Sequence, residues 1–205
     1  MDIDYYQLLM KRILDIVFSI LMIVFLVPAM IMISFAIKID SKGPLIFKQA
    51  RLGRYGKPFI LFKFRTMVVG AENMGTGLFN YKNDGRVTRV GKVLRLISLD
   101  ELPQLFNIFK GEMAFVGPRP PVTYEYGRYE AFSDKVKKRF VVRPGITGYA
   151  QIKGRNELSW DEKVKYDIEY IDKFKKWGLI LDFKILIVTF TKIVAMQGVY
   201  EIKKD

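Results

Sequence analysis

The chain of 205 residues is long enough for one domain with a packed core, and it carries a net charge of +13 with neither cysteine nor histidine. The absence of cysteine excludes disulfides, thiolate nucleophiles and zinc–cysteine sites, and the absence of histidine removes the commonest general base. Acid–base or nucleophilic chemistry must therefore use Asp, Glu, Lys or Tyr, and a bound metal would be a hard, oxygen-liganded ion such as Mg²⁺. The positive charge favours phosphorylated substrates, an anionic membrane surface or nucleic acid.

An almost purely apolar run extends from Ile13 to Ile37 and predicts a helix that inserts into a membrane. As a straight helix it would be about 37 Å long, against a bilayer hydrocarbon core of about 30 Å. Pro28 lies near its middle, where a proline kinks or breaks a helix. Basic residues flank both ends, and such residues favour the cytoplasmic side. The residues alone leave open a kinked spanning helix and a re-entrant helix that breaks at Pro28.

Arg12 and Asp15 lie one helical turn apart at the shallow end of this run. We expect them to pair, because an ion pair reduces the cost of placing a carboxylate in an apolar segment. We divide the chain into a membrane hairpin over residues 1–40 and a compact domain over residues 41–205.

The compact domain begins with two short β-prone runs, Leu45–Arg51 and Pro58–Arg65, separated by turn residues, which predicts a β-hairpin. Residues 66–85 are rich in glycine and asparagine and predict a mobile loop. The remaining pattern predicts a short helix over Arg89–Ile97, a charged helical segment in two pieces over Val122–Phe140 and an amphipathic helix capped by Ser159 over Ser159–Phe174. The predicted fold class is mainly α with a small β-hairpin (α+β).

Trp177–Met196 is strongly apolar, but Asp182, Lys184 and Lys192 interrupt it. Its spacing predicts an amphipathic helix that lies at the membrane interface or packs on the core, rather than a second crossing.

Asp100 and Glu101 form the most informative pair in the chain. Ser98 and Glu101 have the spacing of a capping box, Pro103 suits a first helical turn, and Gly111 predicts the helix end. The helix N-terminus would keep Asp100 ionised and favour a phosphate nearby. The alternative at this point is that both acids only cap the helix.

Arginines lie beside turns, glycines or acids rather than on one evenly solvated face. They are Arg65, Arg86, Arg89, Arg95, Arg119, Arg143 and Arg155. An arginine fork matches phosphate oxygens through paired hydrogen bonds, although a surface salt bridge accounts equally for any single one. Together with an ionised carboxylate pair they indicate a site for a diphosphate.

Ordered motifs over residues 11–160 closely resemble those of the monotopic phosphoglycosyl transferases, also called the bacterial sugar transferase family. The matching segments are Lys11-Arg12-x-x-Asp15, Gly43-Pro44 with Gln49-x-Arg51-x-Gly53, Lys63-Phe64-Arg65-Thr66-Met67, Asp84-x-Arg86-x-Thr88-x-x-Gly91, Leu99–Leu105, Val116–Pro120, Pro144–Gly148, Ala150-Gln151 and Gly154-Arg155-Asn156. No short motif is decisive, but their order is specific.

The resemblance implies transfer of a phosphosugar from a UDP-sugar to polyprenyl (undecaprenyl) phosphate, with release of UMP, as the first membrane step of glycan assembly. It implies that Asp100 is the nucleophile, that Glu101 orients groups or takes a proton from the acceptor, and that Mg²⁺ bridges the diphosphate and Asp100. Arg95 and Arg119 match arginines of the phosphate site. Further candidates for phosphate binding are Lys63, Arg65, Arg86, Arg143 and Arg155.

The resemblance also implies a re-entrant membrane segment, with both termini and the catalytic domain on the cytoplasmic side of the bacterial inner membrane. The chain is similar to the small, catalytic-domain-only class. Membrane lipid is an expected partner, nucleic acid is not, and a homodimer stays open. Val27 precedes Pro28 where a serine often assists the break, which leaves the stability of the break open.

Two rival functions fit parts of the sequence. A membrane-anchored basic protein that binds lipid or nucleic acid would explain the charge but not the ordered motifs. A metal-dependent glycosyltransferase would release UDP and could use Asp2-x-Asp4, although that pair precedes the membrane segment and is typical of a solvated terminus.

Overall fold

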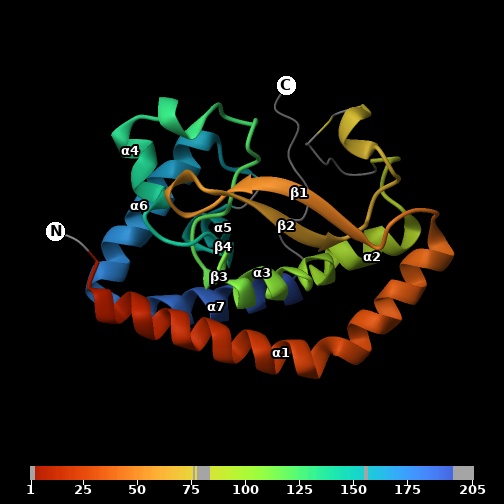
Figure 1. The fold of residues 1–205 in the computed structure, drawn as a ribbon, viewed down its shortest axis with the longest axis horizontal. Coiled ribbons are helices and arrows are strands. Elements are labelled where there is room, and N and C mark those ends of the chain that lie inside the picture. Colours follow the sequence, from red (N-terminus) through yellow and green to blue (C-terminus); the bar gives the residue numbers. More distant parts are fainter. Residues whose placement is uncertain (1–2, 76, 78–83, 155–156, 196–205) are drawn as a thin grey trace.

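A computed structural model describes residues 3–75, 77, 84–154 and 157–195 (Figure 1). Its longest element is α1 (Tyr5–Asp40), which contains Pro28. Figure 1 shows that α1 bends about midway, with the bend pointing away from the rest of the molecule and both arms returning toward it. A proline bends a helix because it lacks the N–H group and clashes with the preceding turn. The helix is therefore continuous through Pro28 and bent, and the re-entrant arrangement that the resemblance implies stays a prediction.

A β-hairpin follows α1, and its Phe64 lies in the same buried cluster as Ile37 near the end of α1. Strands β1 (Ile46–Leu52) and β2 (Pro58–Phe64) pair antiparallel, with Ile46 opposite Phe64 and Leu52 opposite Pro58. The 3₁₀ turn η1 (Arg54–Gly56) joins them. The predicted hairpin is confirmed.

The acidic pair lies between two short helices, α2 (Arg89–Leu96) and α3 (Gln104–Lys110). The predicted capping box is wrong, because Ser98 has a positive φ of 58° and its side chain makes no capping hydrogen bond. Asp100 and Glu101 instead belong to a 3₁₀ turn, η3 (Leu99–Glu101), that precedes α3. The predicted end is confirmed, because Gly111 caps α3 in the left-handed region.

A second strand pair, which is parallel, was not predicted from the sequence. β3 (Ala114–Val116) pairs with β4 (Gly145–Thr147), and each is too short to show a period. The backbones approach closely here: a Cβ on Gly148 would lie 2.1 Å from the carbonyl oxygen of Gly117. Only glycine allows this contact, which holds the segment after β3 against the start of α5 (Tyr149–Lys153).

The C-terminal helices build the main core. α6 (Trp160–Trp177) begins with the predicted Ser159–Glu162 capping box, and α7 (Leu179–Val194) packs Leu181 and Ile185 into the same cluster as Phe174. The predicted helix after Trp177 is thus confirmed as one packed on the core. Among the described residues, α1 is the one helix long and apolar enough to cross a membrane.

The expected helical segment over Val122–Phe140 is only partly helical. It contains η4 (Tyr129–Ala131), α4 (Asp134–Lys137) and η5 (Lys138–Phe140), and it is irregular before residue 129. The predicted mobile loop over residues 66–85 includes η2 (Ala71–Asn73), and residues 76 and 78–83 lie outside the described part.

Polar side chains fasten α1 to the domain. Lys11 forms a buried ion pair with Asp182 of α7, and Asp182 also accepts a hydrogen bond of 2.8 Å from Tyr170. The predicted direct pair of Arg12 and Asp15 is not formed among the described contacts. Arg12 donates to two carbonyl oxygens at the end of α3 at 2.7 and 3.0 Å, whereas the Asp15 carboxylate accepts from the Phe115 amide at 3.2 Å. Arg12 and Asp15 therefore each bind backbone groups of the domain and not each other.

Candidate active site

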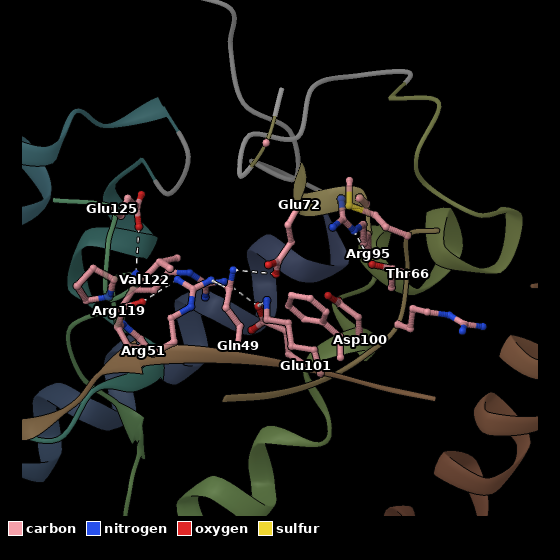
Figure 2. Close-up of a pocket in the computed structure, with 18 of the residues that line it drawn as sticks. Gln49, Arg51, Thr66, Glu72, Arg95, Asp100, Glu101, Arg119, Val122 and Glu125 are labelled. Atoms are coloured by element: carbon pink, nitrogen blue, oxygen red, sulfur yellow. Dashed lines mark hydrogen bonds and ion pairs between the residues drawn. The ribbon is translucent and has the colours of Figure 1, made fainter. Parts of the chain in front are cut away.

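A cavity of about 480 Å³ lies between the β-hairpin and the C-terminal helices. Its walls come from β1 and β2, residues 65–73, the segment around Arg119, and the α5 and α6 region. Figure 2 shows Asp100 and Glu101 within this cavity, with Arg119 on the Glu101 side and Arg95 on the Asp100 side. The structure therefore brings these four predicted residues, with Lys63, to one place.

Glu101 is held by two cations. Its Oε1 accepts from Lys63 Nζ at 2.7 Å and from Arg119 Nη2 at 2.9 Å. Burial opposes ionisation, but Lys63 and Arg119 outweigh it and hold the pKa of Glu101 well below its usual range. Glu101 is thus a fixed anion that positions two cations at the cavity.

The Asp100 carboxylate differs from that of Glu101 in its contacts and in the direction of its pKa shift. Its side chain lines the same cavity, yet no hydrogen bond or ion pair joins its carboxylate to another described residue. Burial, followed by the influence of Glu101, raises the pKa of Asp100 against the attraction of Lys63, Arg95 and Arg119. Asp100 lies in the turn before α3, where burial raises its pKa and the nearby cations lower it, and the expected effect of the helix N-terminus on its ionisation stays a prediction.

Polar side chains on the hairpin side of the cavity form a hydrogen-bonded wall. Arg51 donates to the carbonyl oxygen of Pro120 at 2.9 Å and to Gln49, and Gln49 donates to Glu72 at 3.1 Å. Burial and then Arg119 lower the pKa of Arg51 to about 10. Gln49 and Arg51 belong to the Gln49-x-Arg51-x-Gly53 motif, but their position at the cavity was not predicted.

Arg95 donates from Nε to Thr66 Oγ1 at 2.8 Å, which holds the guanidinium along the wall near Asp100. Arg95 and Arg119 both line the cavity, as predicted.

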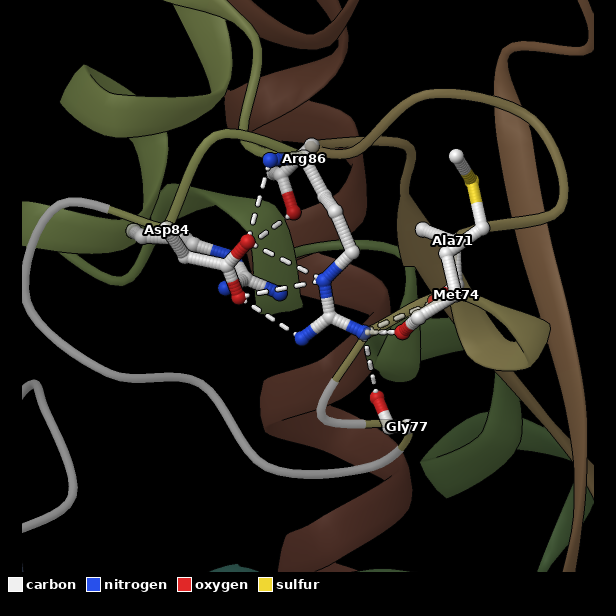
Figure 3. Close-up of polar contacts among 7 residues, drawn as sticks. Ala71, Met74, Gly77, Asp84 and Arg86 are labelled. Atoms are coloured by element: carbon white, nitrogen blue, oxygen red, sulfur yellow. Dashed lines mark hydrogen bonds and ion pairs between the residues drawn. The ribbon is translucent and has the colours of Figure 1, made fainter. Parts of the chain in front are cut away.

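Two predicted phosphate-binding arginines hold the backbone instead. Arg65 is buried and donates to the carbonyl oxygens of Lys42 and Ser41 at 2.9 and 2.6 Å, which ties the end of α1. Arg86 binds the Asp84 carboxylate and donates from Nη1 to carbonyl oxygens of residues 71, 74 and 77 at 2.8, 2.7 and 2.8 Å (Figure 3). Both arginines therefore shape the wall. Arg65 also lines the cavity, and its Nε has no hydrogen-bond partner among the described residues, so its predicted role in phosphate binding stays a prediction, whereas Arg86 does not line the cavity.

Arg143 lies away from the cavity and donates to the carbonyl oxygen of Gly111 at 2.8 Å. Its predicted role in phosphate binding does not fit this position. Arg155 lies outside the described residues.

The α5 and α6 side of the cavity was not predicted as part of the site. Arg139 binds Asp167 at 2.7 Å and also donates to the carbonyl oxygen of Arg119 at 2.9 Å. Trp160 lies under the Arg139 guanidinium at 4.6 Å and stacks on Tyr126 at 3.8 Å. Arg139 and Asp167 carried no motif signal, and only their fold contacts reveal them.

The carboxylates fit a metal only in part. Among the described residues no cluster of three or more His, Cys, Asp or Glu side chains could hold an ion. Asp100 has an unengaged carboxylate, whereas one oxygen of Glu101 is bound by two cations. A Mg²⁺ ion that takes most of its ligands from a substrate's phosphates and water needs only one or two protein carboxylates, so Asp100 fits such an ion.

A basic cavity over a buried carboxylate pair, beside a membrane-type helix, is the arrangement of a protein that handles phosphorylated ligands at a bilayer. The profile of the bacterial sugar transferases matches residues 6–196, and the chain belongs to this family.

Similar proteins occur in several bacteria. EpsL of Bacillus subtilis, an uncharacterized sugar transferase, is 37% identical over 194 residues, covering 95% of this chain and 92% of its own length. A UDP-glucose:undecaprenyl-phosphate glucose-1-phosphate transferase of Klebsiella pneumoniae is 44% identical over 191 residues, covering 91% of this chain and 40% of its own length. An undecaprenyl-phosphate galactose phosphotransferase of Salmonella typhimurium is 39% identical, covering 93% of this chain and 42% of its length. The chain thus spans about two-fifths of the latter two relatives.

Proposed function

We propose that the chain transfers a sugar 1-phosphate from a UDP-sugar to undecaprenyl phosphate, forming a polyprenyl-diphosphate-linked sugar and releasing UMP. The observation that carries this proposal is the contrast within the acidic pair: Asp100 has a free carboxylate, while Glu101 holds Lys63 and Arg119 beside it. The named activities of the Klebsiella and Salmonella relatives support the same reaction class.

In the first step, a carboxylate oxygen of Asp100 attacks the phosphorus that carries the sugar. The bond from this phosphorus to the bridging oxygen of the diphosphate breaks, and UMP leaves with that oxygen. The sugar phosphate is then bound to Asp100 as an acyl phosphate. A carboxylate nucleophile divides one transfer into two displacements.

In the second step, a phosphate oxygen of the lipid acceptor attacks the same phosphorus. The bond to Asp100 breaks and its carboxylate is restored. Glu101 is better suited to orientation than to proton removal here, because an anion with a strongly lowered pKa is a weak base.

Both substrates are anions, and the cavity supplies charge to bind them. Lys63, Arg95 and Arg119 lie around the acidic pair and offset the repulsion between phosphate groups and the nucleophile. Mg²⁺, when bound with the donor, would supply further neutralisation of the diphosphate, and Asp100 is the residue that would hold it.

Exposed apolar side chains support the proposed membrane placement. α1, α3 and α7 lie on one side of the molecule in Figure 1, and these helices expose Phe25, Phe109, Phe183 and Phe190. The bend of α1 supports a re-entrant helix that enters one leaflet, with both ends on the cytoplasmic side of the bacterial inner membrane. In this position the acceptor's phosphate would meet the cavity at the membrane surface.

The proposal is tested with the full chain in detergent or nanodiscs, undecaprenyl phosphate, Mg²⁺ and a panel of UDP-sugars. We expect UMP to form in step with lipid product, and a protein adduct of one sugar phosphate on residue 100 to accumulate when the acceptor is omitted. Release of UDP, or product formation without any adduct on residue 100 under single-turnover conditions, would contradict it. Binding of anionic vesicles or nucleic acid without turnover would favour the rival binding function.

A further inference from the structure

One buried side chain in the cavity has polar atoms without protein partners. Gln151 of α5 is 9% exposed, and neither its Oε1 nor its Nε2 has a hydrogen-bond partner among the described residues. It lines the large cavity and also an adjoining one of about 370 Å³, which meets the first at Glu101 and Arg119. Leaving a buried donor and acceptor unpaired is costly, so such an amide is suited to a ligand that supplies both partners.

The α5 and α6 side of the cavity contains further buried polar atoms of this kind. Arg139 and Asp167 bind each other and are 3% and 1% exposed, yet Arg139 Nη1 and Asp167 Oδ1 have no hydrogen-bond partner in the described part of the chain. α5 packs against α6, which carries Asp167, so these groups belong to one side of the cavity. The stacked rings of Tyr126 and Trp160 line this side too and give it a flat apolar surface.

This chemistry does not suit a phosphate. The buried Asp167 carboxylate would repel an anion, and Arg119 is already bound to Glu101. A flat, neutral ring with alternating donors and acceptors fits better, because it can lie against aromatic rings and pair with an amide at its edge.

We infer that the α5 and α6 side of the cavity binds the nucleobase of the donor nucleotide, with Gln151 hydrogen-bonded to the imide edge of a uracil ring. Oε1 accepts from the ring N3–H group, and Nε2 donates to the adjacent carbonyl oxygen. The inference rests on the proposed function, since it assigns one part of the proposed UDP-sugar to these residues. It makes Gln151 a determinant of base recognition, separate from the phosphate-binding cations.

The test measures binding of UMP, CMP and inorganic pyrophosphate to the full chain in detergent with Mg²⁺, by calorimetry. For Gln151→Ala we expect UMP affinity to fall about 10- to 100-fold, as for the loss of two hydrogen bonds, while pyrophosphate affinity stays within about twofold. Gln151→Glu keeps the size of the side chain but has only acceptors, so we expect it to weaken UMP more than CMP and to lower the ratio of the two affinities.

Gln7→Ala is the matched control. The Gln7 amide oxygen is also buried without a partner, but Gln7 lines neither cavity. We expect UMP affinity to be unchanged in this variant.

The inference is overturned if Gln151→Ala binds UMP within about twofold of wild type, or if pyrophosphate affinity falls in parallel. Unchanged UMP affinity with an altered preference among UDP-sugars would overturn it too, by placing Gln151 at the sugar. If the wild type turns over UDP-sugars and Gln151 proves neutral, only the base subsite fails. A wild type that neither turns over UDP-sugars nor binds UMP overturns both proposals.

Discussion

Two regions of the molecule use arginine in opposite ways. At the acidic pair, Arg119 binds a carboxylate and keeps part of its guanidinium at the open cavity, with 37% of the side chain exposed. In the wall over residues 65–87, Arg65 and Arg86 are buried and donate to backbone carbonyl oxygens. The two kinds look alike in the sequence. The difference teaches that the partner of an arginine, rather than its motif, decides whether it can bind a ligand.

Among the changes to residues of the cavity, Asp100→Asn should give the largest loss of activity. An amide cannot form the acyl phosphate, so we expect turnover to fall by about 10⁴-fold or more. UMP release and adduct mass spectrometry check this. Because burial raises the pKa of Asp100, replacing its charge should leave the fold intact, which thermal melting would verify. Substantial turnover by the variant would remove Asp100 from the role of nucleophile.

Arg119→Ala should lower kcat/KM by about 100-fold, since one cationic donor at a developing charge is commonly worth that much. Glu101 would retain Lys63 as its partner. Arg89→Ala is a suitable control, because Arg89 is exposed and lines neither cavity. Equal losses of activity in the two variants would show that Arg119 contributes only general positive charge.

Arg86→Ala should act mainly on stability. It removes the partner of Asp84 and the donor to three carbonyl oxygens, so we expect the free energy of unfolding to fall by about 2 kcal/mol. Turnover per folded molecule should change by about threefold or less, when assayed well below the melting temperature. A large loss of turnover without a change in melting would instead place Arg86 at the substrate.

The smallest expected effects are on the pH dependence of stability, where Glu101 and Asp100 should act in opposite directions. Glu101 has a lowered pKa, so its contribution is present above its ordinary value of 4.5 and is lost as pH falls below it. Asp100 has a raised pKa, so its ionised form destabilises the fold at neutral pH and ceases to do so as pH falls.

We therefore expect Glu101→Gln to melt below wild type at pH 7, with the gap closing at acid pH. Asp100→Asn should melt slightly above wild type at pH 7, with that gap closing too. Thermal melts from pH 8 down to about pH 2 check both, with the Glu101 change expected below pH 4.5. Shifts of the same sign for both variants at pH 7 would contradict the assignment.

Much of the fold could be predicted because its elements carry local signals. The hairpin has turn residues between β-prone runs, and α6 has a capping box, so both were predicted correctly. The strands β3 and β4 have three residues each and depend on a backbone approach that no local pattern encodes. The cap predicted at Ser98 was wrong, because the residue has the spacing of a cap but its backbone adopts a positive φ.

The candidate site divides in the same way. Asp100, Glu101, Arg95 and Arg119 lie near one another in the chain and in space, so motif order could locate them. Arg139 and Asp167 belong to distant segments that tertiary packing brings to the cavity, and their ion pair has no sequence signature. The structure was needed to tell a wall-forming arginine from one that faces a ligand.

The buried contacts of α1 have a mechanical consequence. Lys11, Arg12 and Asp15 each bind a different part of the domain, so the helix cannot roll about its axis without separating buried charges from their partners. An apolar helix fastened in this way acts as a rigid footing and not as a flexible tether. In the proposed membrane setting, it would fix the height of the cavity above the lipid tails, so that each acceptor phosphate arrives at the same depth.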